Sequence, residues 1–135
     1  MAIHLGGRDL VNVRQMEVVV NGPDGANHLI LCTGTANLGT MHRDTYTFLV
    51  GPRLVRRQFV GVIISGAITA IKANHNRSSA YDVQEQFDAS LIMIDAAFDD
   101  EACQVRVRAE VSSGSAVSII AISFLVSILA ELQKC

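Results

Sequence analysis

Charge is scarce in this sequence, and lysine is nearly missing. Charged residues make up 18% of the 135 residues, fewer than the roughly 25% of a typical soluble domain. The formal net charge is −2, and only Lys72 and Lys134 are lysines. This balance excludes a protein that binds nucleic acid through a global basic field, so any contact with an anion must be local and made by arginine. The low charge also suggests that much of the surface is buried between subunits.

Recognisable metal, redox and catalytic motifs are lacking too. The three cysteines, Cys32, Cys103 and Cys135, have no metal-ligand or redox spacing, which predicts reduced intracellular thiols. The histidines are scattered, with no pair at ligand spacing. No serine has a nucleophile-elbow context, and the stretch from Gly34 to Gly39 lacks the lysine of a phosphate-binding loop. We therefore expect no enzyme, no metal, no cofactor and no small-molecule substrate.

Length and composition predict a single domain spanning residues 1–135. An apolar fraction of 50% is ample for a hydrophobic core. The first residues, from Met1 to Gly7, contain no basic segment followed by an apolar one, so we expect no secretory signal.

Two alternating runs late in the chain predict an antiparallel hairpin. From Cys103 to Val111 every odd position is apolar or small, and the positions between them are polar. The run from Tyr81 to Met93 alternates in the same way, apart from Glu85. The acidic residues from Asp99 to Glu101 are typical of the turn between two such strands. Each strand should bury one face and expose the other.

The segment from Val111 to Ala130 has no charged residue and predicts one long apolar helix. Ser112 to Ser115 can end the preceding strand and cap a helix that begins at Ala116. On this helix the polar residues Ser123, Ser127, Glu131 and Lys134 would form one narrow stripe. A tail anchor in a membrane is the alternative, because about 20 uncharged residues can span a bilayer.

A helix with so narrow a polar stripe needs apolar cover on two sides. One sheet cannot supply it, so we expect a second copy of the chain to cover the rest. The residues expected at this dimer and assembly contact are Val117, Ile120, Phe124, Leu125, Ile128 and Leu132.

Earlier segments predict further strands. Leu10 to Val20 and His28 to Ala36 are rich in β-formers and flank a loop with glycine and proline, which is typical of a hairpin. Thr45 to Val50 alternates and stops at a Gly-Pro turn. Arg56 to Ala73 fits a strand or a helix, but its β-branched residues and internal glycines favour a long strand with a bend near Gly66. The expected fold class is α+β, with an N-terminal hairpin, a meander of long antiparallel strands and one C-terminal apolar helix.

The polar face of the late hairpin gathers arginine and amide side chains. The residues expected there are Arg57, Gln84, Gln86, Arg106 and Arg108. Guanidinium and amide groups can contact the phosphates and bases of RNA. The alternative is a solvated face, on which Asp88 neutralises one of the arginines as a cross-strand pair.

The order of these elements resembles that of the coat proteins of small single-stranded RNA bacteriophages. The segments that carry the resemblance are Arg56 to Val62, Tyr81 to Phe87, Gln104 to Arg108 and Phe124 to Leu132. They are similar, in that order, to the start of the long middle strand, the penultimate strand, the last strand and the helix of that family.

The resemblance implies a symmetric homodimer whose sheets join edge to edge. Many such dimers would close a shell around RNA, in a virion assembled in the cytoplasm of a bacterial host. We therefore expect a capsid subunit that binds itself and RNA, with no membrane partner. The alternative function is a small dimeric domain that binds an apolar ligand between helix and sheet.

Overall fold

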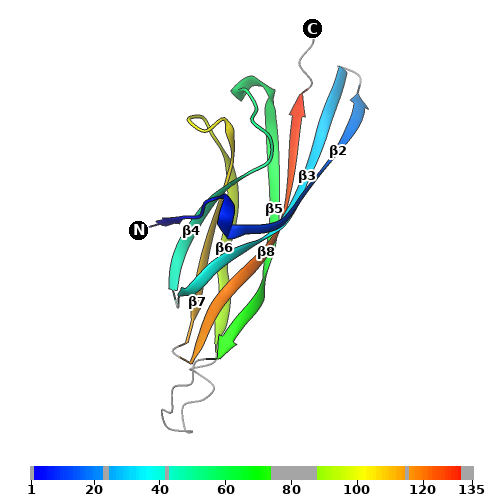
Figure 1. The fold of residues 1–135 in the computed structure, drawn as a ribbon. Coiled ribbons are helices and arrows are strands. Elements are labelled where there is room, and N and C mark those ends of the chain that lie inside the picture. Colours follow the sequence, from blue (N-terminus) through cyan, green and yellow to red (C-terminus); the bar gives the residue numbers. More distant parts are fainter. Residues whose placement is uncertain (1, 23–24, 42, 74–87, 115, 132–135) are drawn as a thin grey trace.

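The chain folds into two four-stranded β-sheets that share one core (Figure 1). The computed structural model describes residues 2–22, 25–41, 43–73, 88–114 and 116–131. The strands are β1 (Ala2–His4), β2 (Leu10–Gly22), β3 (Gly25–Met41), β4 (Arg43–Val50), β5 (Phe59–Ala73), β6 (Ala89–Asp99), β7 (Gln104–Ser113) and β8 (Val117–Glu131). Two short 3-10 turns, η1 (Gly7–Asp9) and η2 (Arg56–Gln58), precede β2 and β5.

Each sheet combines strands that are distant in the sequence. One has the order β1-β4-β7-β6, and we name it the β4–β7 sheet; the other has the order β2-β3-β8-β5, and we name it the β3–β8 sheet. Neighbouring strands are antiparallel, except that β1 runs parallel to β4. Strand β8 follows every other described strand in the chain, yet it lies between β3 and β5 in the middle of its sheet.

The core lies between the two sheets. The inward residues of β7, namely Val105, Val107, Ala109 and Val111, are at most 1% exposed. Ile30, Val126 and Ile128 of the β3–β8 sheet belong to the same buried cluster. Burying one aliphatic side chain of this size is worth about 1.5–3 kcal/mol, so this layer is the main source of stability between the sheets.

Phe124 fits into the core because its neighbour on β3 is a glycine. Gly34 of β3 and Gly66 of β5 are its direct neighbours across the sheet. A Cβ atom on Gly34 would lie 2.8 Å from the Phe124 ring, and one on Gly66 would lie 2.9 Å from the backbone oxygen of Ser123. The ring can therefore pack against Phe48 of the other sheet, with 5.0 Å between ring centroids.

Most of the predicted strands are confirmed. The N-terminal hairpin forms from β2 and β3, with Gly22 opposite Gly25. The strand predicted from Thr45 is β4, and the segment predicted from Arg56 is η2 followed by the long strand β5. The late hairpin forms from the antiparallel strands β6 and β7, although its predicted start, residues 81–87, lies outside the described residues.

The predicted C-terminal helix is wrong, and so is the α+β, coat-protein-like fold class that depended on it. The segment is strand β8, and the described part of the chain has no helix longer than the two 3-10 turns. Ser123, Ser127 and Glu131 recur every four residues, a spacing that places them together on a helix stripe and equally on one face of a strand. Among the described residues no helix is long and apolar enough to cross a membrane.

Physical preference explains why this segment is extended. β-Branched residues, which favour a pleated surface, occupy much of it: Val117, Ile119, Ile120, Ile122, Val126 and Ile128. Pairing with β3 on one side and β5 on the other provides backbone partners along both edges of β8. Its inward side chains enter the core that the sequence had assigned to a helix face.

A bulge in β6 changes which residues face the core. The register with β7 shifts between Leu91 and Met93. Before the shift Leu91 faces inward, and after it Ile94 and Ala96 do, opposite Ala109 and Val107. Ile92, at the bulge, is 51% exposed. The uninterrupted apolar run from Leu91 to Ile94 is the sequence signature of this change of phase.

Candidate functional site

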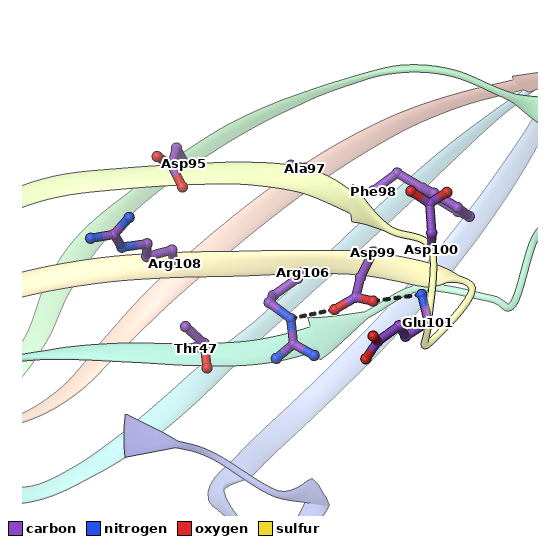
Figure 2. Close-up of a pocket in the computed structure, with 9 residues that line it drawn as sticks. All are labelled: Thr47, Asp95, Ala97, Phe98, Asp99, Asp100, Glu101, Arg106 and Arg108. Carbon is purple, nitrogen blue, oxygen red and sulfur yellow. Dashed lines mark hydrogen bonds and ion pairs between the residues drawn. The ribbon is translucent and has the colours of Figure 1, made fainter. Parts of the chain in front are cut away.

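The polar surface predicted for the late hairpin lies on the outer side of the β4–β7 sheet. An open depression there is lined by Thr47, Asp95, Ala97, Phe98, Asp99, Asp100, Glu101, Arg106 and Arg108. Figure 2 shows these side chains on β4, β6, β7 and the β6–β7 turn. Alternation along β7 explains the position of the two arginines, because Val105 and Val107 on either side of Arg106 face the core.

Asp99 and Arg106 form a closed ion pair at one end of this depression. The Arg106 Nε donates to Asp99 Oδ2 at 2.7 Å. The other carboxylate oxygen, Oδ1, accepts the backbone N–H groups of Glu101 at 2.9 Å and Ala102 at 3.0 Å, as Figure 2 shows for Glu101. The Ala102 N–H, followed by the Arg106 side chain, lowers the pKa of Asp99. Asp99 thus holds the turn and neutralises Arg106 at once.

Arg108 also lies beside a carboxylate. Asp95 is its direct cross-strand neighbour on β6, and Thr47 is its neighbour on β4. The depression as a whole is lined by four acidic side chains and two arginines. Its local charge is therefore negative, which opposes the approach of phosphate groups.

Of the five residues predicted to bind RNA, the structure brings two together. Arg106 and Arg108 share the depression, whereas Arg57 lies on η2 in the connection between β4 and β5. Gln84 and Gln86 lie outside the described residues. The carboxylate that pairs with Arg106 is Asp99. The sequence had suggested Asp88 for that role.

The connection that carries Arg57 is fixed against the β6–β7 turn. The backbone N–H of Leu54 donates to the carbonyl of Cys103 at 2.8 Å. The Arg56 Cζ lies 5.5 Å from the centroid of the Phe98 ring, and the Arg56 Nε lies 3.8 Å from Asp100 Oδ1. These contacts hold Arg56 against the turn, next to its acidic residues.

A second depression contains a histidine that has a structural hydrogen bond. It is lined by His4, Leu5, Gly6, Gly7, Leu10, Phe48, Leu49, Gln104 and Arg106. His4 Nδ1 bonds with the buried hydroxyl of Thr47, and this bond joins β1 to β4. The described residues contain no group of three or more metal-ligating side chains.

The outer side of the β3–β8 sheet has a different character. Ile30, Val126 and Ile128 face the core, so the residues that alternate with them face outward. We name the outward set of this sheet the outer face. Its large side chains are apolar, namely Met16 and Val18 of β2, Leu31 of β3, Ile63 of β5, and Leu125 and Leu129 of β8. Small polar residues such as Ser65, Ser123 and Ser127 lie between them. Ile63 is 76% exposed and Leu125 is 41% exposed.

Strand β2 adds further apolar surface at the sheet edge. Every residue from Val11 to Asn21 is exposed, including those on the side opposite the outer face. Figure 1 shows the β2–β3 hairpin projecting at the upper right, away from β4 and β7. An edge strand of this length with valines on both sides presents open backbone groups and apolar side chains together.

The residues predicted for assembly fall into different places. Val117, Phe124 and Ile128 are at most 3% exposed and belong to the interior of the chain. Ile120 is half-buried, and Leu132 lies outside the described residues. Leu125 is the one described member of the set that reaches the exposed surface. Sequence reasoning missed the rest of the outer face, although the alternation Ser123, Leu125, Ser127, Leu129 is visible once a strand is assumed.

Comparisons with known proteins identify no relative. The chain matches no family model, no catalogued protein and no solved structure. Function must therefore be argued from the two outer surfaces of the molecule, one charged and one apolar.

Proposed function

We propose that this protein is a non-enzymatic structural subunit that associates with copies of itself. The observation that carries the proposal is the apolar outer face, together with the exposed valines of β2. In a single chain Met16 and Val18 are 62% and 42% exposed, and Ile63 and Leu125 are 76% and 41% exposed. Contiguous exposed apolar surface of this kind marks an interaction site, because its burial is the main favourable term in protein association.

The low charge of the sequence supports the same proposal. Charged residues are few overall. Most of the described ones lie on the β4–β7 sheet or in the connections between strands, and few lie on the β3–β8 sheet. A closed shell is the form of assembly suggested by the coat-protein resemblance, but the strand at β8 removes the helix that carried part of that resemblance. The proposal therefore rests on the exposed apolar surface and the low charge, and not on that resemblance.

Two sequence-based alternatives gain no support from the geometry. RNA binding at the polar face remains a prediction, since both arginines of the depression lie beside carboxylates. Binding of an apolar ligand between helix and sheet required a helix, and that segment is the central strand β8.

The proposal is tested by the mass of the purified protein in solution. Light scattering over a range of protein concentrations should give a species heavier than the 14.5 kDa monomer. Association should persist at high salt, because burial of apolar surface is not screened by ions. A monomer at every concentration would overturn the proposal.

A further inference from the structure

We propose that the outer face of the β3–β8 sheet packs against the same face of a second copy, with the two copies related by a two-fold axis. This inference rests on the proposed function and specifies the surface that performs it. The arrangement would be two sheets packed face to face, at the ~10 Å separation seen between the layers of β-sandwiches.

The two outer surfaces of the molecule differ in charge. Outward positions on β6 and β7 carry Asp95, Asp99, Arg106 and Arg108, as expected of a sheet face in water. On the β3–β8 sheet the charged outward residues lie at the margins: Arg14 on the edge strand, Glu131 at the end of β8, and Lys72 near the end of β5, opposite Ser118. The outward positions between them on β3, β8 and β5 carry no charge. Such a surface suits contact with another apolar surface.

The outer face also has a regular relief of large and small side chains. Large and small side chains alternate along β8, where Ser123, Leu125, Ser127 and Leu129 face outward. Strand β5 alternates in the opposite phase, so that Ser65 lies beside Leu125 and Ile63 lies beside Ser127. The β5–β8 part of the outer face is therefore a chequered surface, in which each large side chain has a small neighbour across the strand pair. On the β3 side Leu129 lies beside Leu29.

A second copy is the partner that this chequered surface fits. When the same pattern is turned about a two-fold axis, the large side chains of one copy can enter the hollows at Ser65 and Ser127 of the other. Interdigitation of this kind is how the inner faces of two sheets form a core. A two-fold contact also needs only one self-complementary patch per chain.

The area of the outer face is also sufficient for a dimer contact. From Asn27 to Asn37 strand β3 is paired with β8, and the sheet there is four strands wide. At about 3.4 Å per residue and about 4.8 Å between strands, this part of the face covers roughly 700 Å². Stable interfaces bury roughly 600–1,000 Å² on each partner. The face is therefore large enough for a specific dimer without contributions from other surfaces.

The test replaces Leu125 by lysine and compares it with a matched change on the other sheet. Leu125→Lys puts a charge in the middle of the proposed contact, and Ile92→Lys puts one at an exposed apolar position on β6. Because an unpaired charge cannot be buried cheaply, Leu125→Lys should weaken self-association by about a hundredfold or more. Ile92→Lys should associate as the wild type does. Sedimentation or light scattering of each protein gives the comparison.

Ile63→Lys provides a second variant with little risk to the fold, because Ile63 is the most exposed of the large apolar residues. It should also produce monomers, and circular dichroism should show an unchanged β-sheet spectrum.

The outcomes separate this inference from the function on which it rests. If the wild type associates and both lysine variants of the outer face associate equally well, the outer face is not the contact, while the proposed function stands. If the wild type is monomeric, both fail. If the wild type is monomeric and binds phosphatidylcholine vesicles through this face, the partner is a lipid surface and the inference is overturned.

Discussion

Single residues decide whether the charged depression on the β4–β7 sheet can bind an anion. Arg106 was expected to be free for RNA, but its guanidinium group pairs with Asp99, which also accepts two backbone N–H groups of the turn. The sequence shows both residues without showing that they meet, because the bulge in β6 sets the register that brings Asp99 beside β7. Side-chain alternation along β7 correctly placed Arg106 on the outer side of the sheet. It could not predict that Asp99 would lie beside it.

Tyr46 provides a residue-scale prediction about pH. Its hydroxyl donates to the Leu38 carbonyl at 3.1 Å in the buried core. Burial, with a smaller effect of Asp44, raises the pKa of Tyr46 to about 12. An unfolded chain would ionise this group near pH 10. The contribution of Tyr46 to the free energy of unfolding is therefore complete below pH 10 and decreases as the pH rises towards 12.

Tyr46→Phe should cost about 1 kcal/mol at pH 8, where the lost hydrogen bond is the main difference. Above pH 10 the gap between wild type and variant should narrow, because the wild type alone has this group to ionise. Urea unfolding at pH 8, 10 and 11, at one protein concentration, measures the gap. A gap that stays constant or widens with pH would contradict the assignment.

At the scale of elements, the sequence predicted hairpins well and the last strand badly. The N-terminal hairpin could be read because a loop of glycine and proline separates two β-rich runs, and β2 pairs with β3 as expected. Strand β8 could not be predicted from the sequence, because Ser123, Ser127 and Glu131 fit both a helix stripe and a strand face. Its two strand partners come from distant parts of the chain, and local sequence carries no record of them.

The glycines of β5 give a prediction at this scale. Gly66 is an exposed residue of β5, but a Cβ atom on it would lie 2.7 Å from the Ile94 side chain and 2.9 Å from the Ser123 backbone oxygen. Gly66→Ala should lower the free energy of unfolding by about 1–3 kcal/mol, because the backbone oxygen cannot move aside without disturbing the ladder.

Gly61→Ala is the matched control in the same strand. A Cβ atom on Gly61 would meet nothing within 4 Å. Its effect should be small or stabilising, since alanine loses less backbone entropy than glycine on folding. Urea unfolding measures both changes. If they destabilise the protein equally, the contacts of a Cβ atom at Gly66 with Ile94 and Ser123 are not the reason that alanine is unfavourable there.

For the whole molecule, the two outer surfaces make separate experiments possible. The charged depression belongs to one sheet and the outer face to the other. A change in one should leave the other intact, because the core lies between them. Neither the sequence nor its periodicity showed that the arginines and the apolar contact would lie on opposite sides of the protein.

The RNA prediction can therefore be tested without disturbing assembly. It requires that wild-type protein purify with RNA, and that Arg106→Gln, Arg108→Gln double-variant protein retain less. The fall in affinity with salt should have a log–log slope of about 0.7 per neutralised phosphate for single strands, and the double variant should flatten it. The ratio of absorbance at ultraviolet wavelengths and the retained RNA at two salt concentrations give the measurement. Equal RNA content in both proteins, or none in either, would assign the depression to a solvated role.

The central position of β8 has a consequence for biosynthesis. Strands β3 and β5 cannot complete their sheet until the segment between Val117 and Glu131 has left the ribosome and inserted between them. Until then both long strands present unpaired edges to other nascent chains. A fold that depends on such distant pairings closes slowly, on the millisecond-to-second scale typical of β-sandwiches. The yield of native protein in a cell should therefore depend on chaperones and on growth temperature more than its final stability would suggest.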